Sequence, residues 1–292
     1  MKRLIVTADD FGLAVPVNEA VEEAHRRGIL TAASLMVGAP AAADAVARAR
    51  RLPSLGVGLH LVLVDGLPVL SPEAVSELIG PKGALSPRPF RTGAALALSR
   101  SARRQMEAEL QAQFEAFRRT GLPLDHVNGH HHVHLHPAVL TLVLRVAREY
   151  RVPAVRVVHE PPLRSWRAIG DRLGQRVGNW LSHLPWAWLM KRRLRAAGVA
   201  YNDTLFGLND SGRMDRSRLL GFLERLPEGV TELYCHPATR QWPGPFAPRH
   251  DYTCTEEFAA LTDPEVVATI RRRDIATISF ARLGAHHRGG AP

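Results

Sequence analysis

Apolar runs of strand length alternate with helix-like segments along most of this chain of 292 residues, and three of these runs end in carboxylates or imidazoles. The three runs are Arg3–Thr7, Leu55–His60 and Pro123–Val127. Such alternation is typical of a mostly parallel α/β fold. In an α/β barrel the carboxyl ends of the strands meet at one mouth, where active sites lie. The sequence therefore predicts an α/β barrel whose polar strand ends form the active site.

The other predicted elements follow the same alternation and show no domain boundary. Helices are expected at Pro16–Arg27, Ala41–Arg51, Gln105–Arg119, Pro137–Tyr150 and Arg216–Leu226, and strands at Leu30–Val37, Val152–Val158 and Val230–Cys235. Residues 63–100 contain several Pro and Gly and are expected to form a long excursion over the mouth. Residues 160–200 break the rhythm and predict a helical insertion. We expect a single domain over residues 1–283 and a disordered tail at residues 284–292.

Composition limits the class of protein. With 46% hydrophobic residues the chain can bury a sizeable core. No run approaches the ~18 apolar residues of a membrane span, and no signal peptide is visible, so a cytoplasmic location is expected. The formal net charge of +10 would suit an anionic partner or membrane surface. Because no helix-turn-helix, zinc-finger or RNP signature is present, nucleic acid is not expected as a partner.

Asp9 and Asp10 stand together at the end of the first predicted strand. A turn needs one such residue, and two adjacent carboxylates repel each other unless a cation or a shared proton compensates. If a divalent metal is present, one carboxylate can bind it and the other can act as general base. The residue types alone leave open which Asp has which role.

Histidines provide the strongest local signal. Five lie within seven residues, at positions His130, His131, His132, His134 and His136, and a metal would favour their neutral form. They cannot all be ligands, and Pro137 indicates that a helix begins directly after them, with His130 closest to the strand end. His60 and His236 also end predicted strands. Their positions predict that they join the same mouth, where His236 could protonate a leaving group.

These motifs resemble a known family. Ala-Asp-Asp-Phe-Gly-Leu at 8–13, Gly-Leu-His at 58–60, His-His-His-Val-His at 130–134 and Cys-His-Pro at 235–237 look like the YdjC-like carbohydrate deacetylases, and the match continues to Leu-Thr-Asp-Pro at 261–264. The resemblance implies a distorted (β/α) TIM-like barrel. It also implies metal-dependent hydrolysis of an N-acetyl group from an acetylated amino sugar.

Site residues follow from this resemblance. Asp10, His60 and His130 would bind a divalent metal, with Zn or Mg expected, Asp9 would be the general base and His236 the general acid. Arg156 could bind the sugar or a neighbouring carboxylate. One departure concerns Asn128-Gly129, where many members have Asp-Ser, so any orienting role of that carboxylate is in question here.

Within the family the chain looks most similar to the hopanoid-biosynthesis-associated branch. The similarity lies in residues 31–38 and 154–160, and it implies an N-acetylglucosaminyl group on a polycyclic lipid. Residues 160–200 contain four of the five Trp, interleaved with Arg and Lys, a pattern that suits either a helix in a membrane interface or a cap packed on the barrel. An oligomer is possible in principle.

Three rival interpretations remain open. Two imidazoles and one carboxylate are also the ligands of non-haem iron oxygenases, which acetate release without oxygen would exclude. A non-catalytic peripheral membrane or lipid-binding protein could use a structural metal. A third alternative keeps the deacetylation but has a soluble chitooligosaccharide as its substrate.

Overall fold

Parallel strands form the centre of the computed structural model, which describes residues 1–80, 83–87 and 99–283. Within these residues the strands are β1 (Lys2–Phe11), β2 (Ala32–Leu35), β3 (Gly56–Leu61), β4 (Leu124–Gly129), β5 (Thr204–Phe206), β6 (Gly229–Cys235) and β7 (Ala276–Thr277). Their order is β4-β3-β2-β1-β6-β5, and β7 pairs with the start of β1. Parallel neighbours need long crossovers, which helices provide. All strands therefore end on the same side of the sheet.

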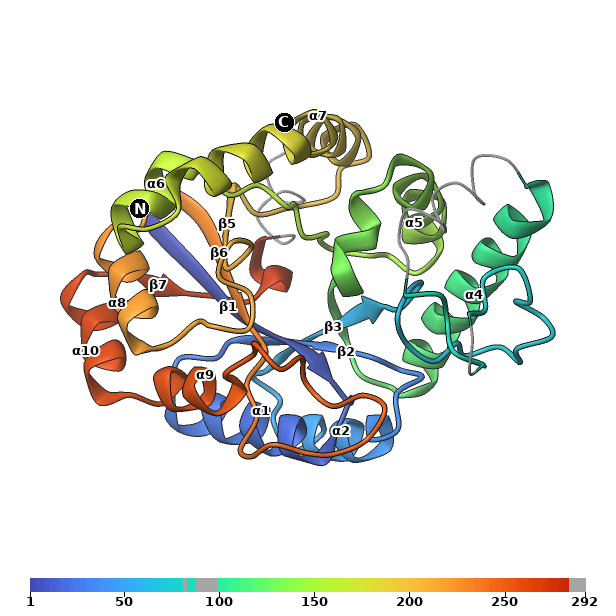
Figure 1. The fold of residues 1–292 in the computed structure, drawn as a ribbon, viewed down its shortest axis with the longest axis horizontal. Helices are drawn as coiled ribbons and strands as arrows, with labels where there is room; N and C mark the ends of the chain where they lie inside the picture. The colour runs from blue at the N-terminus through green and yellow to red at the C-terminus, as the bar shows by residue number, and fades with distance from the viewer. Residues whose placement is uncertain (81–82, 88–98, 284–292) are drawn as a thin grey trace.

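Helices surround these strands (Figure 1). They are α1 (Val15–Arg27), α2 (Ala42–Ala49), α4 (Arg100–Arg119), α5 (Pro137–Glu149), α6 (Pro162–Ile169), α7 (Leu173–Ala196), α8 (Arg216–Glu224), α9 (Cys254–Leu261) and α10 (Pro264–Arg272). In the view of Figure 1, α1 and α2 lie below the strands, α6 and α7 above them, and α4 and α5 to the right. A large hydrophobic core joins strands and helices, and smaller buried clusters lie beside it. The predicted distorted TIM-like barrel in a single domain is confirmed.

The barrel closes irregularly between β4 and β5, and the strand predicted at Val152–Val158 is wrong. Only isolated bridges join Val127 to Val155 and Ala154 to Ala200 within the described residues. The side-chain amide of Asn202 donates to the carbonyl of Val157 at 2.9 Å and accepts from its N–H at 2.7 Å. A side chain thus satisfies backbone groups that a neighbouring strand would otherwise pair, and Pro153 has no N–H to offer a ladder.

Helices α6 and α7 fill the region of residues 160–200. Ala187, Met190 and Leu194 bury one face of α7 against the barrel. In the part of the chain that the structure describes, no helix combines the length and apolar character needed to cross a membrane. The tail at 284–292, expected to be disordered, lies outside the described residues.

The excursion after β3 is described at residues 63–80 and 83–87, and it is fastened to α4. The carboxylate of Glu109 accepts the N–H of Val69 at 2.8 Å and of Leu70 at 3.0 Å. The amide of Gln113 pairs with both backbone groups of Val62. Residues 88–98 of the excursion lie outside the described residues.

Candidate metal centre and active site

The end of β1 directs two consecutive carboxylates into one cavity. Neighbours on a regular strand point to opposite faces. Asp10, however, has a left-handed backbone with φ of 61°, and the register with β2 shifts between Ala8 and Phe11. Asp tolerates this conformation better than most residues do. The kink explains how both Asp9 and Asp10 line the cavity.

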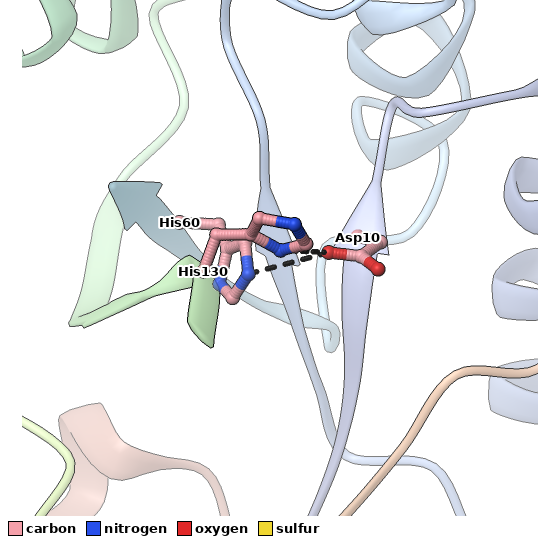
Figure 2. Close-up of side chains that lie close together, drawn as sticks. All are labelled: Asp10, His60 and His130. Atoms are coloured by element: carbon pink, nitrogen blue, oxygen red, sulfur yellow. Dashed lines mark hydrogen bonds and ion pairs between the residues drawn. The ribbon is translucent and has the colours of Figure 1, made fainter. Parts of the chain in front are cut away.

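Asp10, His60 and His130 form a compact group of possible metal ligands. Oδ1 of Asp10 lies 3.3 Å from Nε2 of His60 and 3.1 Å from Nδ1 of His130. Figure 2 shows both imidazoles directed toward this oxygen from separate elements of the barrel. One ligand atom from each residue lies within 4.8 Å of the other two. A carboxylate and two imidazoles suit a divalent transition metal, and three protein ligands facing a cavity are typical of catalytic rather than structural sites.

Asn128 orients the candidate ligand His60 from behind. Its Oδ1 lies 2.7 Å from Nδ1 of His60, and its Nδ2 donates to Oδ1 of Asp9 at 3.1 Å. Because the Asp9 carboxylate only accepts, the amide oxygen must face His60, whose Nδ1 therefore carries the hydrogen. Nε2 of His60 is then free to bind a metal. Asn128 stands where many proteins with these motifs have Asp, which raised the question of what orients the metal site. These contacts show that Asn128 itself can do so.

Arg156 holds Asp9 in place. Its guanidinium is completely buried and contacts both oxygens of Asp9, with Nη2 2.9 Å from Oδ1. Nε of Arg156 also donates to Oε1 of Glu232 at 2.9 Å. Burial raises the pKa of Asp9, but Arg156 and His60 outweigh it and hold that pKa below its ordinary value. Arg156 was expected to bind either the sugar or a neighbouring carboxylate. The structure shows it bound to carboxylates, and its side chain does not line the cavity.

His236 faces the same cavity from the end of β6. Its backbone N–H donates to the carboxylate of Glu257 on α9, which also accepts the N–H of Met214 at 2.8 Å. Burial lowers the pKa of the His236 ring, although Asp10 and Asp9 oppose this shift. Nδ1 of His236 is buried and has no hydrogen-bond partner among the described residues. Because His236 lines the cavity and its ring makes no hydrogen bond to the described residues, the ring is free to bond a ligand there.

The remaining histidines of the cluster separate because their backbone is kinked. His131 and His132 have left-handed φ values of 51° and 55° inside the 3₁₀ helix η2 (His130–Leu135). His131 then reaches Asp65 at 3.0 Å and His132 reaches the hydroxyl of Tyr234 at 3.1 Å. Nε2 of His134 lies 3.0 Å from the carbonyl of Arg156, to which it can only donate. Nδ1 of His136 accepts the N–H of Ala138 and caps α5.

Burial keeps the rings of His132 and His134 neutral. Burial and Arg156 lower the pKa of His134 to about 3, and the pKa of His132 also lies well below its ordinary value. His130 differs, because Asp10 raises its pKa despite the burial. Asp65 and His131 also form a group with His130 that could hold a metal, but both are exposed.

The cavity has a volume of about 370 Å³. Polar side chains from the strand ends form one part of it, whereas Leu67, Leu208, Trp242 and Phe246 give it apolar walls. Sequence analysis missed Tyr234 and Glu232. They lie on β6, two and four residues before His236 respectively. Because successive side chains of a strand point to opposite faces, Tyr234 and Glu232 are expected on the same face as His236.

Comparisons with known proteins agree with this geometry. The sequence profile of the family described as YdjC-like protein matches residues 3–272. A carbohydrate deacetylase of Geobacillus stearothermophilus is 34% identical over 277 residues, which are 94% of this chain and 96% of that protein. A carbohydrate deacetylase of Mus musculus is 32% identical, with 99% and 98% covered. A crystal structure of a proposed cellobiose-phosphate cleavage protein from Enterococcus faecalis V583 has a TM-score of 0.73 at 24% identity, over 97% of this chain and 98% of that one, and supports the fold.

Proposed function

Because this chain belongs to the YdjC-like family, we propose that it is a metal-dependent N-deacetylase that removes acetate from an N-acetylglucosaminyl group. The observation that carries the proposal is the group Asp10, His60 and His130, which opens onto the same cavity as Asp9 and His236. Amide hydrolysis needs a polarised carbonyl, a base for water and an acid for the leaving amine. This cavity offers a candidate for each.

Asp10, His60 and His130 would hold the cation, and Zn²⁺ suits them better than Mg²⁺ because two of the three donors are imidazoles. When bound, a divalent cation supplies Lewis acidity, which polarises a carbonyl and promotes the ionisation of water. The fixed tautomer of His60, with Nε2 free, fits this use. The donor set thus fits the group that the family implies.

Asp9 and His236 would move the protons. Asp9 would accept a proton from the attacking water, since Arg156 and Asn128 hold its carboxylate ionised and in place. His236 would donate a proton to the amine nitrogen, which is a poor leaving group without it. We assign Arg156 to the positioning of Asp9 and not to sugar binding, because its guanidinium is buried.

The substrate is proposed to be lipid-linked, with a hopanoid as the lipid. Apolar walls at Leu67, Trp242 and Phe246 would suit an apolar group beyond the sugar. The outer face of α7 exposes Trp188 by 61%, whereas Trp186, exposed by 46%, lies two residues away on the opposite flank of the helix. We further propose that this face, together with the exposed Leu163 of α6, touches a membrane surface where such a substrate would reside.

Acetate release by metal-loaded protein tests the proposal. An N-acetylglucosaminyl lipid and N,N′-diacetylchitobiose are compared, with a chelated sample as control. We expect metal-dependent acetate from the lipid. Acetate from the soluble sugar alone would keep the chemistry and reject the lipid. Absence of metal-dependent acetate from both would reject the deacetylase and favour a binding protein.

The assigned base has its own test. Asp9→Asn should keep the metal and lose turnover by about 10²- to 10⁴-fold, the usual contribution of proton transfer. Near-normal turnover in this variant would contradict the role of Asp9. Acetate release under anaerobic conditions would exclude the oxygenase alternative.

A further inference from the structure

Beneath the candidate metal site, four buried polar side chains form a continuous chain through the barrel. Nδ2 of Asn128 donates to Oγ of Ser34 at 2.8 Å, and Oγ lies 3.0 Å from Nε2 of His126. Nδ1 of His126 lies 2.9 Å from Oδ2 of Asp125. The chain begins at Asn128, the residue that contacts both His60 and Asp9.

A neutral His126 gives the hydrogens of this chain a single direction. The carboxylate of Asp125 accepts, so Nδ1 of His126 must carry a hydrogen. Nε2 of the neutral ring then carries no hydrogen and accepts that of the Ser34 hydroxyl, which itself accepts from Asn128. With both ends defined, the amide of Asn128 is held with its nitrogen toward Ser34 and Asp9. Its oxygen is thereby kept toward Nδ1 of His60.

Two glycines of β3 leave the space that Asp125 and His126 occupy. A Cβ on Gly58 would lie 2.4 Å from the ring of His126, and one on Gly56 would lie 2.7 Å from the carboxyl carbon of Asp125. The pairing of β3 with β4 also shifts there, so that Asp125 and His126 both stand opposite Gly58. Such irregularities commonly redirect side chains.

The far end of the chain is equally well fixed. Asp125 accepts the backbone N–H of Ala281 at 2.8 Å and of Phe280 at 3.2 Å. The ring of Phe280 stacks on His126, with centroids 4.6 Å apart. Thus the segment after β7 anchors a chain that ends at the candidate active site.

We propose that Asp125, His126 and Ser34 are positioning residues, which act through Asn128 to fix the metal-binding tautomer of His60 and the orientation of Asp9. This inference rests on the proposed metal site, and it assigns the role to residues that touch neither metal nor substrate. Hydrogen-bond partners behind a ligand commonly change metal affinity by about 10- to 100-fold.

Removal of one hydroxyl tests the chain. Ser34→Ala should lower the affinity for Zn²⁺, measured by competition with a chromophoric chelator, by about tenfold or more. The matched control is Thr231→Val on β6, because the hydroxyl of Thr231 is equally buried but has no partner among the described residues. Its affinity for Zn²⁺ should be that of the wild type. If Ser34→Ala does not fold, His126→Phe keeps the stacking on Phe280, removes the same link, and should show the same loss.

Histidine tautomers give a readout that a merely structural role would not move. In long-range ¹H–¹⁵N spectra of the Zn²⁺-loaded protein, His60 should carry its hydrogen on Nδ1, and Ser34→Ala should alter its resonances while Thr231→Val should not. Unchanged Zn²⁺ affinity and unchanged His60 resonances in Ser34→Ala would overturn the inference. Loss of affinity in a protein that releases no acetate would instead sustain the inference and reject the proposed function.

Discussion

At the scale of single residues, the charge of Arg156 is central to the candidate site. Its guanidinium is fully buried between Asp9 and Glu232 and lies 4.8 Å from the ring centroid of Tyr234. Oε2 of Glu232 has no partner among the described residues. Two buried carboxylates therefore depend on one cation, and the loss of that cation would leave them uncompensated.

Arg156→Met is expected to reduce the free energy of unfolding by about 3 to 5 kcal/mol, the usual effect of breaking a buried ion pair. Turnover should fall as well, because Asp9 loses its orientation. Urea denaturation followed by circular dichroism measures the first effect. Arg118→Met is the matched control, since Arg118 pairs with Glu115 on the surface and its loss should barely move the midpoint. A midpoint for Arg156→Met equal to that of the control would contradict this account.

The meeting of Asp10, His60 and His130 was predictable from the strand ends, and their roles as ligands followed from the family resemblance, whereas most of the side chains that support them were not predicted. Asp10, His60 and His130 end strands, and strand ends converge in a barrel. Arg156 lies in a segment predicted as a regular strand, and its partner Glu232 is 76 residues away. Pairing at such a distance leaves no local pattern, because it depends on how the barrel closes.

At the scale of elements, β3 shows how one strand serves both packing and chemistry. Its inward face carries Gly56, Gly58 and His60, two residues without side chains followed by a candidate ligand. Since the inward face has a period of two, the same reasoning relates His126, Asn128 and His130 around the end of β4. Sequence analysis identified the two histidine ends of these faces and missed the residues behind them.

Gly58→Ala should destabilise the protein by about 1 to 3 kcal/mol, because its Cβ would overlap the ring of His126. Gly178→Ala on α7 is the matched control: no atom lies within 4 Å of its Cβ, and Ala in a helix should stabilise by about 0.5 to 1 kcal/mol. Thermal denaturation should show opposite shifts. If both variants shift the midpoint in the same direction, the close approach of β3 to His126 is not as described.

Helix α9 fixes the end of β6 through Glu257, and this contact should depend on pH. Burial raises the pKa of Glu257 from 4.5 to about 7, although two backbone N–H groups oppose the shift. The folded state therefore holds a proton that the unfolded state has lost between these values. The contribution of Glu257 to stability is complete below about pH 4.5 and is lost as the pH rises to about 7.

Glu257→Gln should remove this part of the pH dependence. Between about pH 4.5 and 7 the wild type should lose on the order of 1 to 3 kcal/mol more stability than the variant does. Urea midpoints at several pH values measure the difference. A wild type and a variant with parallel profiles would show that Glu257 titrates in the folded state as it does in the unfolded state.

At the scale of the whole molecule, positive charge and exposed aromatic rings coincide on α6 and α7. Neither helix contains Asp or Glu, and the exposed residues of α7 include Trp186, Trp188 and Arg192. The guanidinium of Arg192 lies 5.8 Å from the ring centroid of Trp188. The sequence presented a membrane interface and a packed cap as alternatives. The inner face packs, while the outer face retains the features that an interface requires.

The position of α7 near the candidate active site supports a functional role for its exposed surface. The inner side of α7 carries Trp180 and Leu184, which lie with Leu208 around a gap too narrow to admit water. Leu208 also lines the candidate active site. A lipid surface held by α7 would therefore lie near the cavity in which a lipid-linked sugar has to bind. In Figure 1, α1 and α2 lie on the opposite side of the strands from α7, so their charges serve as a reference.

Binding to vesicles should therefore depend on α7 and on anionic lipid. The protein is expected to sediment with phosphatidylcholine vesicles that contain phosphatidylglycerol, and less so as salt rises. Arg192→Gln with Arg195→Gln should weaken binding by about 30-fold, because each basic residue near an anionic surface contributes about 1 kcal/mol. Arg26→Gln with Arg27→Gln on α1 is the control of equal charge. Equal losses in the two pairs would mean that the net charge of +10 attracts the vesicle without a defined face, and the membrane contact of α7 would have to be abandoned.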